Sequence, residues 1–188
     1  MPKGACALVI FAHGSGSGKN SPRNKMVAAA LNKKKIATLL FDLLTPKENK
    51  MFANRFRISF LVKRLEGATA WAEGVPELQG LPVAYFGAST GAAAAIIAAA
   101  RAGKKIKTVI SRGGRPDLAI AEIGKVKAPI LFLVGSIDPM MPENKKAYAQ
   151  ASRGKKFIII PGAGHIFEEK GTMDMVVKET VAWFEKHL

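Results

Sequence analysis

The chain has 188 residues and is 48% hydrophobic, which favours one globular domain with a single core. No apolar stretch reaches the length of a membrane-spanning helix, so we expect no membrane span. The net charge of +15 is compatible with a nucleic-acid partner. The lysine clusters, however, are scattered and lack interleaved aromatic residues, so we expect no specific nucleic acid and interpret the charge as a lysine-rich surface.

The cysteine content and the N-terminus bear on the compartment. A single cysteine, Cys6, excludes an internal disulfide and favours the cytoplasm. The apolar run after Lys3 faintly resembles a secretion signal, but no cleavage-type segment follows it. We interpret that run as a buried strand and expect a cytoplasmic protein.

Strand-like and helix-like segments alternate along the whole chain. Most strand-like segments are continuous apolar runs, which is typical of parallel strands that helices cover on both faces. The alternation predicts an α/β fold, with one domain over residues 1–188 and a sheet of about six mainly parallel strands. In chain order the predicted elements are strand Ala7–His13, helix Pro22–Lys35, strand Ala37–Asp42, helix Arg57–Ala72, strand Pro82–Phe86, helix Thr90–Ala102, strand Thr108–Ser111, a short helix Pro116–Ile123, strand Pro129–Gly135, helix Pro142–Ser152, strand Phe157–Ile160 and helix Thr172–His187.

A glycine-rich loop, HGSGSGK, follows the first predicted strand and precedes a helix. A phosphate-binding Walker A loop would need a glycine at His13 and a hydroxyl residue at Asn20. A dinucleotide-binding loop would need its third glycine at Lys19 or at Ser21. Both phosphate-binding interpretations are disfavoured on these residues, and we expect no cofactor and no metal. For His13 we expect a structural role, in which its ring bonds the loop backbone.

The segment GASTG, residues 87–91, lies between a predicted strand and an alanine-rich helix. A G-x-S-x-G sequence in that context is typical of the nucleophile elbow of serine hydrolases. The turn is so sharp that Ser89 is expected at positive φ, and Gly87 and Gly91 let the strand and the helix approach closely. Ser89 is therefore the candidate nucleophile.

Two later residues complete a candidate catalytic triad. Asp138 follows the predicted strand ending at Gly135, and His165 follows the last predicted strand in a glycine-rich loop. The chain order Ser, Asp, His is the order of the α/β-hydrolase arrangement. The alternatives are an ordinary loop histidine and, for Asp138, a helix N-cap. Asp42, at the end of an earlier strand, is the alternative acid.

An oxyanion hole needs two backbone N–H groups beside the nucleophile. The residue after the nucleophile, Thr90, is expected to supply one of them. The glycine-rich loop is expected to supply the other, from Ser15 or from Gly16, because glycine lets the loop turn its amides toward the reacting carbonyl.

The segments FAHGSGS, YFGASTGAAAA, LFLVGSIDP and PGAGHIFEE resemble the dienelactone-hydrolase-like branch of the α/β-hydrolase superfamily. The resemblance covers essentially the whole chain and includes small hydrolases that are fused to phosphoribosyltransferases. It implies Ser89, Asp138 and His165 as the triad. Dienelactone hydrolases proper use a cysteine nucleophile, whereas this elbow carries serine, so generic ester hydrolysis is the safer inference.

The site is expected to be open. Only residues 112–128 separate two predicted strands, which leaves room for a helix and two loops but not for a lid. The side chains near the predicted site have two alternative roles, either contact with substrate or packing in the core. For Arg112, as for Arg115, the alternatives are a bond to backbone carbonyls and contact with a substrate carboxylate. The candidate substrate-binding residues are Phe52, Phe56, Arg112, Met140, Met141 and Phe167.

These features predict a serine hydrolase that cleaves small, short-acyl carboxylic esters through an acyl-enzyme. A thioesterase or acyltransferase with the same triad is the first alternative, and a basic, non-catalytic binding module is the second. The expected partner is a small-molecule ester. The last predicted strand would lie at an edge of the sheet, so we expect a monomer or an edge-strand homodimer.

Overall fold

The computed structural model describes residues 1–152 and 154–188 and contains a six-stranded sheet. The strands lie in the order β2-β1-β3-β4-β5-β6, and each neighbouring pair is parallel. The predicted α/β fold is confirmed, with all rather than most of the strand pairs parallel. The strands are β1 (Ala7–Ala12), β2 (Ile36–Leu40), β3 (Val83–Ala88), β4 (Ile106–Arg112), β5 (Ile130–Gly135) and β6 (Lys156–Ile160).

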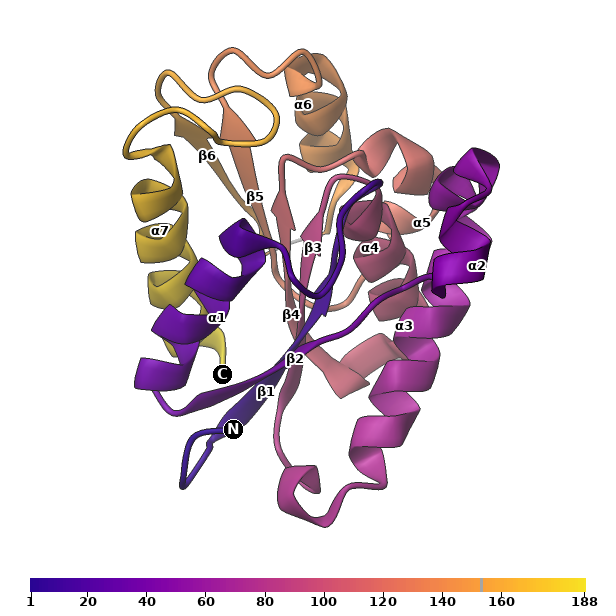
Figure 1. Ribbon diagram of the computed structural model, residues 1–188. Coiled ribbons are helices and arrows are strands. Elements are labelled where there is room, and N and C mark those ends of the chain that lie inside the picture. Colours follow the sequence, from indigo (N-terminus) through magenta and orange to yellow (C-terminus); the bar gives the residue numbers. More distant parts are fainter. Residues whose placement is uncertain (153) are drawn as a thin grey trace.

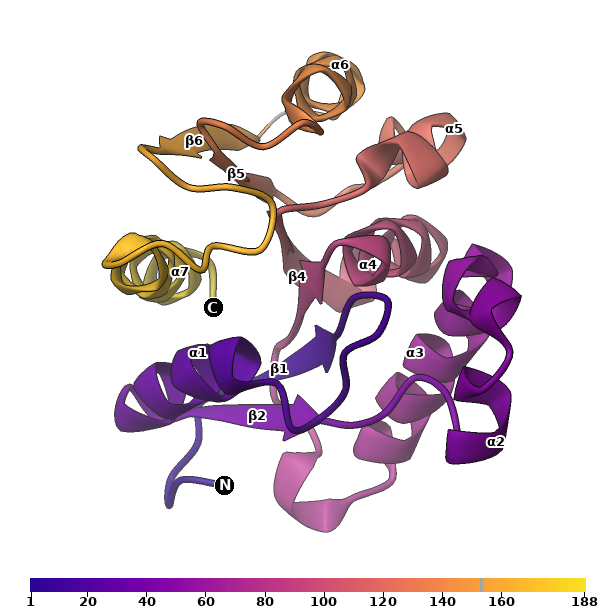
Figure 2. The same ribbon diagram turned by 45° about the horizontal axis from the view of Figure 1, so that its top comes forward.

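Helices cover both faces of the sheet (Figure 1 and Figure 2). One face carries α1 (Pro22–Lys33) and α7 (Thr172–His187). The other carries α3 (Ile58–Glu73), α4 (Thr90–Ala102), α5 (Ile120–Ile123) and α6 (Met141–Gln150). The connections contain the short helix α2 (Pro46–Asn49) and the 3-10 turns η1 (Phe52–Phe56), η2 (Pro76–Leu78), η3 (Gly103–Lys105) and η4 (Pro116–Ala119).

Burial on both faces explains why the strand sequences do not alternate. All residues of β1 and β5 are buried, and their side chains point in turn into the two core layers. The alanine-rich helix α4 is buried along most of its length. Alanine is the strongest helix former, and its small side chain lets α4 lie close to the sheet.

The elements differ from the predicted ones mainly at their ends. Helix α1 ends at Lys33, two residues early, because Lys35 has φ 59° and leaves the helical conformation. Strand β4 is longer than predicted and includes Arg112. The short elements α2 and η1 were not predicted, although Thr45 and Glu48 form a capping box at the start of α2.

The parallel sheet brings the predicted catalytic residues to one edge. Strands β3, β5 and β6 run in the same direction, so the loops after them, which carry Ser89, Asp138 and His165, emerge at the same end. Between β4 and β5 the chain forms only η4 and α5, and no lid domain is found in residues 1–152 and 154–188. Within those ranges, no helix combines the length and the apolar character needed to cross a bilayer.

Candidate active site

Ser89 occupies a strained turn between β3 and α4. Its φ is 49°, a value that residues with a side chain rarely adopt. The flanking glycines are required by close backbone approaches. A Cβ on Gly87 would lie 2.5 Å from the Cα of Ala92, and a Cβ on Gly91 would collide with the carbonyl of Ala12 in β1. The elbow geometry predicted for this segment is thus present.

Ser89, His165 and Asp138 form a continuous hydrogen-bonded chain. The Oγ of Ser89 lies 3.1 Å from Nε2 of His165. The Nδ1 of His165 lies 3.1 Å from each carboxylate oxygen of Asp138. The Asp138 side chain is fully buried, whereas the imidazole is 27% exposed. This arrangement lets the imidazole take a proton from the hydroxyl while the carboxylate fixes its tautomer.

Asp42, the alternative acid, is bound elsewhere. Its carboxylate accepts the backbone N–H of Lys19 at 2.8 Å and pairs with the ammonium of that residue at 3.4 Å. The bond from the Lys19 backbone is the main cause that lowers the pKa of Asp42. Asp42 therefore anchors the glycine-rich loop, and His165 bonds Asp138.

His13 bonds the backbone of the loop that it begins, as expected. Its Nδ1 lies 3.0 Å from the carbonyl oxygen of Gly14, and its Nε2 accepts the N–H of Leu43 at 3.0 Å. These bonds require a neutral ring with its proton on Nδ1. Burial lowers the pKa of His13, which favours that neutral form.

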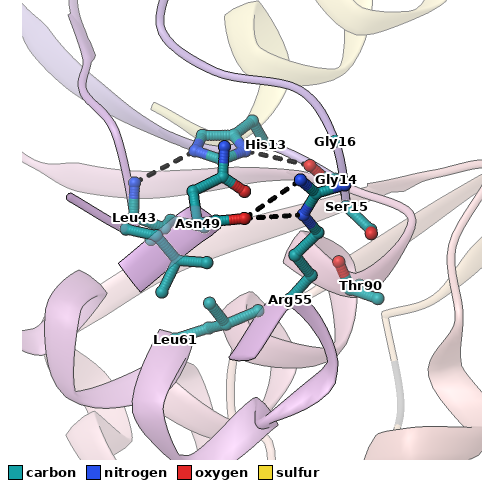
Figure 3. A pocket seen from close by; sticks show the side chains of 10 residues that line it. His13, Gly14, Ser15, Gly16, Leu43, Asn49, Arg55, Leu61 and Thr90 are labelled. Atoms are coloured by element: carbon teal, nitrogen blue, oxygen red, sulfur yellow. Dashed lines mark hydrogen bonds between the residues drawn. The ribbon is translucent and has the colours of Figure 1, made fainter. Parts of the chain in front are cut away.

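The three expected oxyanion-hole residues lie around one small cavity, shown in Figure 3. Its volume is about 210 Å³ including its mouth. In the loop, the N–H of Ser17 bonds the carbonyl of Gly14 at 3.1 Å, and Gly16 has φ 72°. This turn bond does not use the amides of Ser15 and Gly16. The residues around the cavity are His13, Gly14, Ser15, Gly16, Leu43, Leu44, Asn49, Arg55, Leu61 and Thr90.

Arg55 is a residue of this cavity that the sequence did not single out. It belongs to η1, and its Nε and Nη2 donate to the backbone carbonyl of Asn49 at 3.3 and 3.0 Å (Figure 3). Its Nη1 lies 3.8 Å from the position that a Cβ on Gly16 would take. The guanidinium is therefore fixed in place beside the glycine-rich loop. The only sequence signal was the capping box of α2, which places a folded segment before it.

The six candidate substrate-binding residues do not line this cavity. Phe52 and Phe56 lie on η1 with their rings 5.2 Å apart and are 66% and 41% exposed. Phe167 is buried in the core layer that contains α1 and α7. Half-buried Met140 and Met141 follow Asp138, and Met141 packs against the core below α6.

Arg112 is buried as the last residue of β4. Its guanidinium carbon lies 5.5 Å from the centroid of the Phe167 ring, and its Nε has no hydrogen-bond partner among the described residues. Burial, together with the nearby charge of Arg23, lowers the pKa of Arg112 to about 10. The packing alternative fits Phe167 as it is placed here better than direct contact with a substrate. For Arg112, no bond to a backbone carbonyl is found among the described residues, and its guanidinium packs over Phe167 instead. Arg115 forms an ion pair with Asp117 at 2.8 Å.

The fold is that of α/β-hydrolases. A family model described as an alpha/beta hydrolase domain matches residues 5–185, and the chain therefore belongs to this family. Within it, the chain is dienelactone-hydrolase-like. The crystal structure of a dienelactone hydrolase from Anabaena variabilis is 46% identical, with a TM-score of 0.95 over 100% of this chain and 89% of that one.

The chain is also similar to a longer protein and to a second solved structure. A Mycobacterium tuberculosis protein that bears the name of a phosphoribosyl transferase is 47% identical over 189 residues, which cover 100% of this chain and 43% of that protein. The chain thus spans less than half the length of that relative, as expected from a resemblance to hydrolases fused to phosphoribosyltransferases. The structure of Est1E from Butyrivibrio proteoclasticus has a TM-score of 0.86 at 16% identity, covers 100% of this chain and 91% of that one, and supports the fold alone.

Proposed function

We propose that this protein is a serine esterase that cleaves small, short-acyl carboxylic esters through an acyl-enzyme on Ser89. The observation that carries the proposal is the hydrogen-bonded chain itself. The Ser89 hydroxyl lies 3.1 Å from Nε2 of His165, and Nδ1 of the same ring lies 3.1 Å from the buried carboxylate of Asp138. These are the distances that proton transfer between nucleophile and base requires.

In the first step Ser89 attacks the ester carbonyl and His165 takes its proton. The imidazolium that forms is stabilised by the carboxylate of Asp138. The negative charge on the carbonyl oxygen is held by the amide of Thr90 and by that of Ser15, with Gly16 as the alternative donor. One such donor typically contributes about 3 kcal/mol to transition-state stabilisation. His165 then gives its proton to the departing alcohol.

In the second step water hydrolyses the acyl-enzyme. His165 removes a proton from the water as it attacks the acyl carbonyl, and it returns that proton to Ser89 as the acid leaves. None of these steps assigns a role to a metal or to an organic cofactor. Among the described residues, no group of three or more His, Cys, Asp and Glu side chains could hold a metal ion.

The small cavity beside the expected oxyanion-hole residues supports a preference for short acyl groups. Its volume of about 210 Å³ includes open solvent, so the space that it encloses is smaller still, and it adjoins the nucleophile through Thr90. Leu43, Leu44 and Leu61 form its apolar wall. Similarity to a dienelactone hydrolase supports ester chemistry, but the serine nucleophile gives no reason to restrict the substrate to lactones. We further propose a cytoplasmic protein, either a monomer or a homodimer through the edge of β6.

Labelling with a fluorophosphonate probe tests the nucleophile. We expect the wild type to be labelled and to hydrolyse p-nitrophenyl acetate, and Ser89→Ala to lose labelling and at least about 10³-fold in kcat. Activity should also fall as the acyl chain grows from acetate to decanoate. Persistent labelling of Ser89→Ala would contradict the assignment of the nucleophile. A rise in activity toward long chains would contradict the proposed substrate class.

A thioesterase or acyltransferase would use the same acyl-enzyme. The two reactions are separated by product analysis with a thioester donor and with an added alcohol or thiol acceptor. A basic binding module without activity is the remaining alternative, supported only by the net charge of +15. It would give salt-dependent binding to nucleic acid and no esterase activity above that of Ser89→Ala.

A further inference from the structure

The turn Arg112–Arg115, at the carboxyl end of β4, contacts the loops of Ser89 and His165 directly and is joined to the loop of Asp138 through Asn144. We propose that this turn and the buried side chain of Asn144 form a positioning device that fixes the distances between Ser89, His165 and Asp138. The proposal rests on the function proposed above, because these distances matter for catalysis only if the three residues act as a triad. No residue of the turn contributes a group to the reaction itself.

The first contact is with the nucleophile elbow. The backbone N–H of Ser89 lies 3.1 Å from the carbonyl oxygen of Gly113 and 3.3 Å from that of Arg112. In return, the N–H of Arg115 donates to the carbonyl of Ser89 at 3.1 Å. The nucleophile's own peptide groups are thus bonded in both directions to the turn, so a displacement of the turn displaces Ser89.

The second contact is with the histidine loop. Gly113 has φ 48° and packs directly against the carbonyl of His165, where a Cβ would have no room. That Cβ would also lie 3.0 Å from the ring of Phe167, which covers the guanidinium of Arg112. Phe167 itself is a non-glycine residue at φ 58°. The histidine loop therefore rests on Arg112 and Gly113 in a conformation that this packing supports.

The third contact reaches the aspartate loop through Asn144 of α6. The side-chain amide of Asn144 donates to the carbonyl of Gly114 at 3.1 Å and to the carbonyl of Met140 at 2.8 Å. The backbone N–H of Met140 in turn donates to the carboxylate of Asp138 at 2.8 Å. One buried amide thus joins the turn after β4 to the residue that orients the catalytic carboxylate.

The chemistry of Asn144 indicates that its two donated bonds are the reason for its presence. The residue is 0% exposed, and its Oδ1 has no hydrogen-bond partner among the described residues. A buried acceptor without a partner is unfavourable, and an apolar side chain would pack at this position without that penalty. Among uncharged side chains, only an amide N–H₂ group offers two donors that hold both carbonyls at once.

The experiment compares wild type, Asn144→Ala and Ile106→Val. Ile106 is a buried residue at the opposite end of β4, so the control perturbs the same strand away from the catalytic edge. Two readouts are recorded: kcat and KM for p-nitrophenyl acetate, and the downfield proton resonance of Nδ1 of His165, assigned by its absence in His165→Ala. We expect Asn144→Ala to lower kcat by about 10–100-fold with KM within about twofold, and to shift or broaden the resonance. Ile106→Val should leave both readouts unchanged.

Unchanged kcat and resonance in Asn144→Ala would overturn the proposal, and so would a loss of kcat with an unchanged resonance. If the wild type has no esterase activity but Asn144→Ala still changes the resonance, the positioning role is supported and the proposed function is contradicted. If Asn144→Ala does not fold, Asn144→Ser replaces it, because its hydroxyl keeps one donor. A lower kcat than in the wild type together with a shifted or broadened resonance for Asn144→Ser would then support the proposal, and wild-type values of both would overturn it.

Discussion

The two histidines at the edge of the sheet that carries the candidate triad differ in what their ring nitrogens bond. In His13, Nδ1 bonds the carbonyl of Gly14 and Nε2 accepts the amide of Leu43, so neither nitrogen is free to accept a proton from substrate or nucleophile. In His165, the ring joins a hydroxyl to a carboxylate. Both histidines follow a strand and adjoin a glycine-rich loop, so neither residue type nor local context separates the two proposed roles. The chain order Ser89, Asp138, His165 is the feature of the sequence that favours His165 as the base.

The buried ring of His13 makes stability depend on pH. Its pKa in the folded protein lies below the ordinary value of 6.5, so on acidification the unfolded chain binds the proton first. The stabilising contribution of the neutral ring is therefore complete above pH 6.5 and is lost as the pH falls toward the folded-state pKa. In His13→Asn, which cannot titrate, we expect the free energy of unfolding to fall less steeply over this range. Urea unfolding at several pH values measures both slopes, and equal slopes would refute the assignment.

Among the elements, the connection between β2 and α3 is the part of the site that sequence patterns did not predict. The strands are marked by continuous apolar runs and the helices between them by their periodicity, and the ends of these elements locate Ser89, Asp138 and His165. The segment with α2 and η1 is too short for a periodic signal. Its place at the cavity depends on a contact between Arg55 and the glycine-rich loop, which are far apart in the sequence, and no local pattern encodes such a contact. For the same reason, the burial of Arg112 and the bonds of Asn144 could not be predicted.

The capping box of α2 gives a test of this connection. The Thr45 hydroxyl accepts the N–H of Glu48, and α2 ends at Asn49, whose carbonyl holds Arg55. Thr45→Ala should lower the free energy of unfolding by about 1 kcal/mol and reduce kcat/KM, because the cavity wall loses its anchor. Thr45→Ser keeps the hydroxyl and serves as the control. Thermal unfolding and ester hydrolysis measure the two effects, and a Thr45→Ala variant with wild-type kcat/KM would contradict the link to the cavity.

For the molecule as a whole, one buried hydrogen-bond chain ties the C-terminal helix to the centre of the sheet. The indole N–H of Trp183 in α7 donates to the hydroxyl of Thr108 at 2.7 Å, and that hydroxyl donates to the carbonyl of Pro129 at 2.9 Å. Both side chains are buried, and Thr108 lies near the amino end of β4, away from the catalytic edge. The helix is thereby fixed across strands β4 and β5.

Removal of this hydroxyl should affect stability and leave catalysis intact. Thr108→Val keeps the shape of the side chain but leaves the indole N–H without its partner, so we expect a loss of about 2 kcal/mol in the free energy of unfolding. The kcat for p-nitrophenyl acetate should not change. In the Trp183→Phe variant, Thr108→Val should lower the free energy of unfolding much less than it does in the wild type, because the bond is already absent. Additive losses in denaturant unfolding would show that the two side chains do not interact.

The backbone of Ser89 sets the stability of the fold against the proposed chemistry. At φ 49° a glycine is favoured over any residue with a side chain, by about 1–3 kcal/mol. The side chain proposed as the nucleophile therefore lies at a position where it lowers the stability of the protein. A chain optimised for stability alone would carry glycine here and would give up the proposed reaction.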